Sequence, residues 1–266
     1  MKSTPIIFRR TFAVAFLFIL SCSIFLGKVD AANLHSIIIG DTTAYQIGFS
    51  VEADINTIRN EMNTIATHTD LTLKEKIFSG RDVNSDILQW LKDTNIESDD
   101  VVFIFFSGHG YRTHSKTENI WPNLFLTPEN VGIDFHDVTK IIEEKNPRLM
   151  LAIADCCNNV LPDEHAPPLI KRSKHFLSYV KPDVQNNYYQ LFLNTTGSIK
   201  VSSSMPGDFA WGTRKGGLYT VALIDSLKSE VETSFNPEWS VILERASMTV
   251  INRNVGQTPQ FELSVN

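Results

Sequence analysis

The chain has 266 residues, 42% of them hydrophobic and 20% charged, which is long enough to bury one sizeable core. Its formal net charge is −6, and it contains no internal repeat and no low-complexity segment. This acidic balance argues against nucleic acid or an anionic membrane surface as the partner, and the length favours a single domain.

The first 31 residues differ in kind from the rest. Three basic residues precede an apolar run at 11–27, and small residues near Ala31 supply a cleavage position. We expect a signal peptide, residues 1–31, that exports residues 32–266 as one domain to the periplasm or out of the cell. If it stays uncleaved, its run of about 16 apolar residues, close to the roughly 20 that span a bilayer, would anchor the chain in a membrane. Cys22 would permit a lipoprotein, although the apolar run continues past it.

Removal of residues 1–31 takes away four basic residues and one acidic residue, so the formal charge becomes −9. It leaves Cys156 and Cys157 as the only thiols. Adjacent cysteines cannot close a useful loop, so we expect no structural disulfide. Thiols kept in an exported protein without a bridge to form indicate a chemical role.

From residue 34 onward, short apolar runs alternate with amphipathic stretches, a pattern typical of parallel strands joined by crossover helices. The predicted elements are strand 34–40, helix 50–66, strand 72–78, helix 82–93, strand 100–106, helix 134–145, strand 148–155, helix 185–193, strand 199–204, helix 216–228, helix 238–252 and strand 260–264. The runs at 101–106 and 149–154 are almost wholly apolar, as expected of central strands covered on both faces.

Two segments lack such a pattern. Residues 111–133 form a polar insert in which Pro122, Pro128 and Gly132 are breakers. Residues 158–184 are rich in proline and carry a basic run at 171–174, which predicts an exposed loop.

Residues able to do chemistry follow the two central strands. S-G-H-G at 107–110 comes after the first, and D-C-C at 155–157 comes after the second. In open α/β sheets, ligands bind at the carboxyl ends of the strands, so His109 and Cys157 would meet there if the two strands are neighbours. An imidazole can take the proton of a thiol, and the thiolate is the reactive nucleophile.

These motifs, extended to F-S-G-H-G at 106–110 and A-D-C-C-N at 154–158, resemble those of the clan of caspases, paracaspases, metacaspases and bacterial orthocaspases. His109 and Cys157 are 48 residues apart, and the spacing in caspases is about 50. Residues 201–211 and 216–220 are similar to the cleft-lining segment of bacterial caspase-like proteins. The resemblance covers roughly residues 34–264. It implies an α/β, caspase-like three-layer sandwich with a six-stranded, mostly parallel sheet, and a catalytic dyad of Cys157 and His109.

The strand period distinguishes the two adjacent cysteines. Side chains alternate between the faces of a strand, so Asp155 and Cys157 share a face while Cys156 points away. In the resembling clan, the residue two before the nucleophile lines the S1 pocket, and in metacaspases it is an aspartate that pairs with Arg or Lys at P1. The resemblance thus implies Cys157 as nucleophile and Asp155 as specificity residue, with Cys156 as a buried apolar thiol.

The same resemblance implies an oxyanion hole formed by the amides of Gly110 and Cys157. Asp208 is the candidate for a second polar wall of the S1 pocket, or alternatively an exposed acid in a turn. Asp41 is a candidate cleft residue, or alternatively a helix cap. The chain departs from the family after the nucleophile, with Asn158-Asn159 where caspases have Arg-Gly and metacaspases have His-Ser-Gly. Asparagine tolerates a left-handed backbone and could replace the missing glycine.

Together these residues predict a cysteine peptidase with Cys157 as nucleophile and His109 as general base and then acid, and the resemblance implies an endopeptidase that cleaves polypeptides after Arg or Lys through a Cys157 thioester. We expect no cofactor and no metal, because the histidines and acidic residues show no ligand spacing. Self-cleavage in the loop 158–184 is a corollary. The alternative is a caspase-like module with little or no activity that binds peptides or protein partners.

Overall fold

The computed structural model describes residues 32–159 and 183–266, which all belong to the unit Ala31–Asn266 of the chain. The expected signal peptide and nearly all of the loop 158–184 lie outside the described residues. Within the described ranges, no helix is both long enough and apolar enough to cross a membrane.

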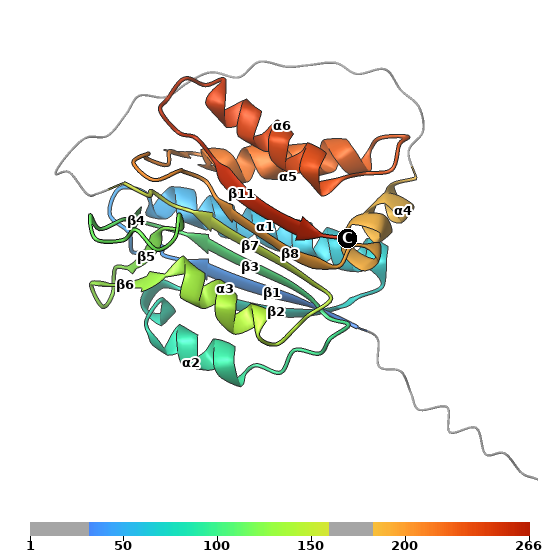
Figure 1. Ribbon diagram of the computed structural model, residues 1–266, viewed down its shortest axis with the longest axis horizontal. Helices are drawn as coiled ribbons and strands as arrows, with labels where there is room; N and C mark the ends of the chain where they lie inside the picture. Colours follow the sequence, from blue (N-terminus) through green and yellow to red (C-terminus); the bar gives the residue numbers. More distant parts are fainter. Residues whose placement is uncertain (1–31, 160–182) are drawn as a thin grey trace, which may run out of the picture. The chain divides into compact units, whose positions relative to one another are not determined.

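A six-stranded sheet forms the centre of the fold (Figure 1). Its strands lie in the order β11 (Gln260–Val265), β8 (Gly197–Ser202), β7 (Leu149–Asp155), β3 (Val101–Ser107), β1 (Asn33–Gly40) and β2 (Thr72–Ser79). The strands are parallel except for β11, which runs antiparallel to β8. Every residue of β3 and β7 is buried, which confirms the two central strands expected from their apolar runs.

Helices cover both faces of this sheet (Figure 1). One layer consists of α1 (Gly48–Thr69), α4 (Val184–Tyr189), α5 (Leu218–Val231) and α6 (Trp239–Ile251), and the other of α2 (Asp86–Asp93) and α3 (Phe135–Glu143). Alternation along the strands assigns each side chain to a layer: Leu151 and Ile153 of β7 pack on the first, Ala152 and Ala154 on the second. The fold is therefore the predicted three-layer sandwich with a mostly parallel sheet.

Two small sheets were not expected from the sequence. The polar insert folds into three antiparallel strands, β4 (Gly110–Tyr111), β5 (Asn123–Leu126) and β6 (Val131–Asp134). A two-stranded hairpin, β9 (Gly212–Thr213) and β10 (Gly216–Gly217), precedes α5. Strands of two to four residues are too short for an alternating pattern to be recognised.

Element ends differ from the prediction by a few residues. The helix expected at 82–93 begins only at Asp86, after a 3₁₀ turn at Gly80–Asp82. The helix expected at 185–193 is α4 continued by a π-helical turn, Gln190–Asn194.

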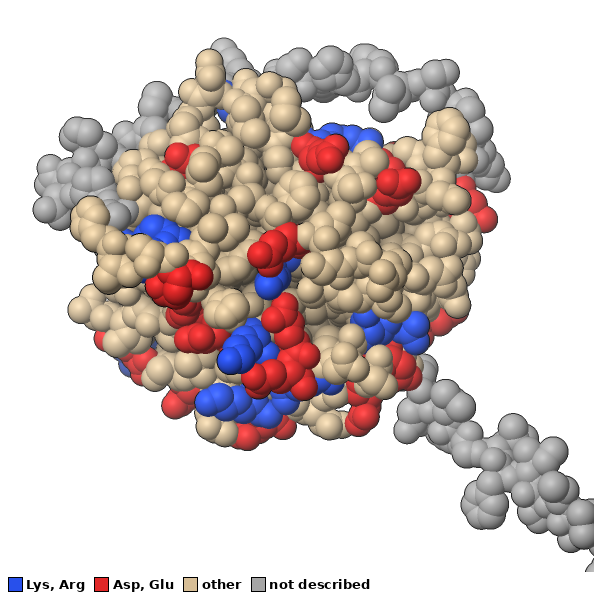
Figure 2. All heavy atoms as spheres, viewed as in Figure 1, with Lys and Arg blue, Asp and Glu red and all other residues tan. Residues whose placement is uncertain are grey.

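Charges of both signs share the face shown in Figure 2. Lys and Arg side chains lie between Asp and Glu in the lower half of the view, where Figure 1 shows α2 and α3. Among the residues that the structure describes, basic and acidic side chains are therefore mixed on this face.

Candidate active site

The register of β3 and β7 brings the two sequence motifs together. Ser107, the last residue of β3, is the Cα partner of Asp155, the last residue of β7. His109 and Cys157 each follow two residues later, so both emerge at the same edge of the sheet. The two strands are neighbours, which is the condition on which a meeting of the histidine and the cysteine depended.

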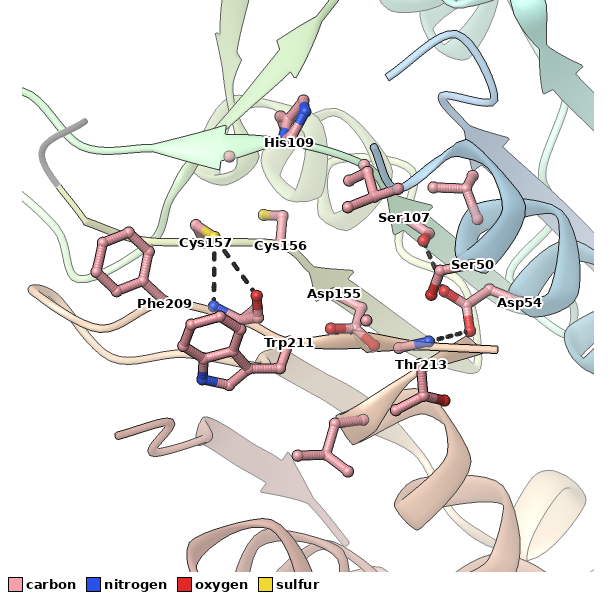
Figure 3. Close-up of a pocket in the computed structure, with 18 of the residues that line it drawn as sticks. Ser50, Asp54, Ser107, His109, Asp155, Cys156, Cys157, Phe209, Trp211 and Thr213 are labelled. Carbon is pink, nitrogen blue, oxygen red and sulfur yellow. Dashed lines mark hydrogen bonds between the residues drawn. The ribbon is translucent and has the colours of Figure 1, made fainter. Parts of the chain in front are cut away.

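A pocket of about 560 Å³ lies at this edge, and both His109 and Cys157 line it (Figure 3). Its other walls come from the loop before α1 with the first turns of α1, from residues 209–214, and from the turn after α6. Aromatic side chains contribute to these walls: Tyr45, Phe49, Phe209 and Trp211. The site is therefore a largely apolar cleft with a few polar groups, as ligand sites usually are.

His109 belongs to the turn between β3 and β4 and is partly exposed. Its Nε2 lies 3.2 Å from the carbonyl oxygen of Tyr45. Because a carbonyl oxygen only accepts, this contact places the proton of the neutral ring on Nε2 and leaves the lone pair on Nδ1. Nδ1 is thus the nitrogen available to take a proton.

The thiol of Cys157 contacts the backbone of Ala210. The Ala210 amide donates to Sγ at 3.3 Å, and Sγ lies 3.7 Å from the Ala210 carbonyl oxygen (Figure 3). Burial raises the pKa of the Cys157 thiol and the charge of Asp155 raises it further, whereas the Ala210 amide lowers it. No hydrogen bond joins Cys157 to His109 within the described part of the chain, and the raised pKa of the thiol favours its protonated form.

Gly110 packs directly against the cysteine segment. A Cβ at this position would stand 2.4 Å from Cys156 Sγ and 2.4 Å from the Cys157 carbonyl oxygen, so only glycine fits. The two expected oxyanion donors, the amides of Gly110 and Cys157, therefore belong to adjoining segments.

Cys156 is 1% exposed and packs in the apolar cluster that contains Ala154 and Met150, on the α2 and α3 side of the sheet. Burial raises its pKa. Both cysteines of the described ranges are free, and no group of three or more metal-ligating side chains there could hold an ion.

Asp155 shares the pocket with a second carboxylate, Asp54 of α1, which is not among the residues expected from the sequence. Asp54 is 1% exposed and accepts hydrogen bonds from Ser107 Oγ and the Gly217 amide, both at 2.7 Å (Figure 3). Asp155 is 6% exposed and accepts from the amide and hydroxyl of Thr220, at 3.0 and 2.5 Å. Burial raises the pKa of both carboxyl groups, and the charge of Asp155 raises that of Asp54 further.

The hairpin strand β10 runs past both acids. A Cβ on Gly216 would stand 2.1 Å from Asp54 Oδ1, and a Cβ on Gly217 would stand 2.1 Å from Asp155 Oδ2. The φ of Gly216 is +118°, which also favours glycine. The sequence does contain a signal for Asp54, because it is an acidic residue on the otherwise apolar face of α1, beside Val51 and Ile58.

Asp41 and Asp208 occupy other places than the cleft positions expected for them. Asp41 is fully buried and accepts from the amide and hydroxyl of Thr43 and from the amide of Thr127. Asp208 accepts from the amide of Thr258 at 2.9 Å. Neither lines the pocket, because their carboxylates bind the backbone of neighbouring loops. This corrects the placement of both residues.

Asn158 is a fully buried anchor directly after Cys157. Its Nδ2 donates to the carbonyl oxygens of Ile120 and Ser204, at 2.9 and 3.3 Å, and its Oδ1 accepts from Arg112 Nε at 3.2 Å. The residues with a positive φ include neither Asn158 nor Asn159. The idea that asparagine replaces a left-handed glycine here is therefore wrong, and side-chain hydrogen bonds direct the chain instead.

Comparisons with known proteins agree with this fold. The family model described as Caspase domain matches residues 38–266. A search of curated proteins found no match. The structure is similar to caspase-1 from Spodoptera frugiperda, with 14% identity, a TM-score of 0.55, and 87% of this chain and 86% of that chain covered. It is also similar to a crystal structure of a protein from Geobacter sulfurreducens, with 10% identity, a TM-score of 0.52, and coverage of 87% and 92%.

Proposed function

Because the chain belongs to the caspase domain family, we propose that it is a cysteine endopeptidase in which Cys157 is the nucleophile and His109 the general base and acid. Membership of the family supports a cysteine peptidase-type function on polypeptide substrates. The observation that carries the proposed roles is the β3–β7 register, which sets both motifs at one edge of the sheet, in one pocket.

The proposed reaction begins when the thiol leaves Ala210 and gives its proton to Nδ1 of His109. The thiolate attacks the carbonyl carbon of the scissile peptide bond, and the amides of Gly110 and Cys157 stabilise the negative charge that develops on the oxygen of that carbonyl. His109 then gives its proton to the leaving amine, and a thioester forms on Cys157. Water, activated by the same imidazole, hydrolyses the thioester and restores the thiol.

We further propose that the P1 residue is Arg or Lys. Two buried carboxylates in one pocket are costly in free energy unless a cation compensates them. Asp54 and Asp155 provide this arrangement: burial raises the pKa of each, and their hydrogen-bond donors among the described residues are amides and hydroxyls, with no basic side chain. A guanidinium or ammonium group between them would lower both pKa values and gain affinity.

One observation favours the alternative of a peptide-binding module with little activity. The Cys157 thiol is bound to Ala210 instead of His109, and its pKa is raised. A peptide that pairs with the backbone at Ala210 would compete for these contacts and release the thiol, which reconciles the geometry with an active enzyme.

A panel of fluorogenic peptides with P1 Arg, Lys, Asp or Asn tests the proposal. We expect turnover with Arg and Lys, lost in Cys157→Ala and kept in Cys156→Ala, the matched control. Loss of turnover in Cys156→Ala alone would contradict the assignment of the nucleophile. A preference for Asp would contradict the role of the two carboxylates, and no turnover on any peptide would favour the binding module.

Export through residues 1–31 and self-cleavage in the loop 158–184 complete the proposal. N-terminal sequencing of the protein purified from its host and of the Cys157→Ala variant tests both. A mature terminus at Ala32 supports export, and a second terminus absent from Cys157→Ala supports self-cleavage. Identical intact chains would contradict self-cleavage.

A further inference from the structure

Arg112, the residue after β4, binds the segment that carries the proposed nucleophile. Its backbone amide donates to the carbonyl oxygen of Asn159 at 3.0 Å, and its side-chain Nε donates to Asn158 Oδ1 at 3.2 Å. Gly110, one of the two proposed oxyanion donors, lies two residues before Arg112. Cys157, the other donor, directly precedes the two asparagines. Arg112 therefore joins the two segments that carry the proposed oxyanion donors.

The terminal nitrogens of the Arg112 guanidinium are bound as well. Nη2 donates to the carbonyl oxygens of Asn119 and Trp121, at 2.8 and 3.3 Å, and Nη1 donates to the carbonyl oxygen of Lys116. The partners that the described residues supply are thus neutral oxygens, so these contacts fix the plane of the guanidinium without neutralising its charge. A guanidinium is a rigid, planar fork, whereas an ammonium group is a single rotating donor, so this set of partners requires an arginine.

The β3–β7 ladder ends before the proposed oxyanion donors. Its last pair is Ser107 with Asp155, and the backbone amide of Arg112 joins the two segments again beyond the donors. Between these two connections the segments touch, because a Cβ on Gly110 would stand 2.4 Å from the Cys157 carbonyl oxygen. The two donor amides are therefore held from both ends, by the ladder on one side and by Arg112 on the other.

Asn158 extends this connection to the wall that holds the thiol. Its backbone amide donates to the carbonyl oxygen of Asp208 at 3.1 Å, and its carbonyl oxygen accepts from the Gly207 amide at 3.1 Å. Ala210, whose amide donates to the thiol, lies two residues after Asp208. The pair of Arg112 and Asn158 thus connects three segments that meet at the candidate active site.

We propose that Arg112 is a positioning residue for the oxyanion hole, a role that rests on the proposed function. Arg112 is not among the described residues that line the pocket, so it acts through Asn158 and the backbone of Asn159. These contacts set the distance and angle between the amides of Gly110 and Cys157, which must point at one oxygen atom in the transition state. A misplacement of about 1 Å can cost about 100-fold in rate, so loss of Arg112 should lower kcat much more than it weakens substrate binding.

Arg112→Met removes the side-chain hydrogen bonds and keeps an unbranched side chain, and a P1 Arg peptide measures its effect. We expect kcat to fall about 100-fold, while KM changes less than about threefold. Arg112→Lys keeps the charge without the fork, and its kcat should fall about tenfold. The rate of Cys157 alkylation by iodoacetamide should stay within about twofold of the wild type in both variants, because this reaction forms no oxyanion.

Arg148→Met is the matched control. The Arg148 guanidinium also binds backbone carbonyl oxygens, those of Asp99 and Leu193, both at 3.2 Å, but at the opposite end of β7. Both methionine variants should melt at a lower temperature than the wild type, and only Arg112→Met should lose kcat. An equal loss of kcat in the two variants, or no loss in Arg112→Met, would overturn the positioning role. If Arg112→Met does not fold, the same comparison is made with Arg112→Lys and Arg148→Lys.

A second measurement does not need turnover. A P1 Arg peptide aldehyde adds to the Cys157 thiol: the sulfur bonds to the carbonyl carbon, and the thiol proton passes to the carbonyl oxygen. The corresponding peptide alcohol cannot form this bond. The ratio of the two affinities should be about tenfold smaller in Arg112→Met than in the wild type, and unchanged in Arg148→Met.

The outcomes distinguish the positioning role from the proposed function. Cleavage after Arg, with kcat and the affinity ratio unchanged in Arg112→Met, would overturn the positioning role and leave the peptidase intact. If the wild type cleaves no peptide, the peptidase proposal fails, and the affinity ratio alone tests Arg112. A ratio that is equal in the wild type and Arg112→Met would then overturn the role, and a ratio that falls only in Arg112→Met would support it.

Discussion

Asp54 of α1 and Asp155 of β7 interact across one glycine: the Gly217 amide donates to Asp54 at 2.7 Å, and its Cα leaves no room for a Cβ beside Asp155. Burial raises the pKa of Asp54 and the charge of Asp155 raises it further, whereas the hydrogen bonds from Ser107 and Gly217 lower it. A change in the charge or position of one carboxylate therefore affects the pKa or position of the other.

Asp54→Asn should stabilise the protein at neutral pH and reduce its activity. The pKa of Asp54 is raised in the folded state because burial disfavours its charged form. The folded protein therefore loses stability as the pH rises through that pKa. The asparagine keeps the shape without the charge, so its melting temperature should exceed that of the wild type at pH 8, with a smaller difference near pH 4. We expect kcat/KM on a P1 Arg peptide to fall about 100-fold, as for loss of a buried ion pair.

Thermal unfolding as a function of pH checks this prediction. Glu52→Gln, an exposed carboxyl group on the same helix, is the control and should change neither quantity. Equal pH dependence in Asp54→Asn and the wild type would show that Asp54 carries no unfavourable charge.

Gly217→Ala should block the P1 site. The new methyl group would lie 2.1 Å from Asp155 Oδ2, so the carboxylate or β10 must move, at a cost of about 1–3 kcal/mol. Gly256→Ala is the control: its φ is +69° and nothing lies within 4 Å of the added carbon, so it costs only about 1–2 kcal/mol of backbone strain. Urea unfolding measures both costs. Only Gly217→Ala should have a lower kcat/KM than the wild type. Equal activity of the two variants would contradict the proposal that the P1 side chain binds beside Asp155.

Asn158→Ala should destabilise the protein by about 2–4 kcal/mol, because it removes the three hydrogen bonds of a fully buried side chain, two to the carbonyl oxygens of Ile120 and Ser204 and one from Arg112. Asn158→Asp keeps an acceptor for Arg112 but not the two donors, and should be destabilised as well. The neighbouring Asn159 is partly exposed, and Asn159→Ala should change stability by about 0.5 kcal/mol or less. If denaturant unfolding finds Asn158→Ala as stable as Asn159→Ala, the anchor has no energetic role.

Alkylation by iodoacetamide should report the protonated thiol of the free protein. Because burial raises the pKa of Cys157, the thiolate fraction at pH 7 is small, and the rate should keep rising with pH beyond the ordinary thiol range. Cys156, which is 1% exposed, should not react while the protein is folded. Mass spectrometry of Cys156→Ala and Cys157→Ala separates the two sites. Fast alkylation of Cys157 at pH 6 would indicate a thiolate paired with His109⁺ and contradict the geometry.

The residues of β3 and β7 show how much local sequence determines. Their apolar runs and the alternation of side chains were sufficient to predict two central strands and the burial of Cys156. These properties depend on neighbours within one strand, so a single sequence contains them.

Local sequence does not predict which residues of other helices and loops enter the pocket. Asp54 stands out as an acid on the apolar face of α1, but its partner Gly217 belongs to β10. The backbone amides of Thr127 and Thr258, which donate to Asp41 and Asp208, also come from segments far along the chain. The sequence by itself therefore determined the strands and the motifs that follow them, and it named His109 and Cys157 as candidates. Only the tertiary structure decided which carboxylates enter the pocket, because that depends on packing between segments whose sequences contain no information about their distance.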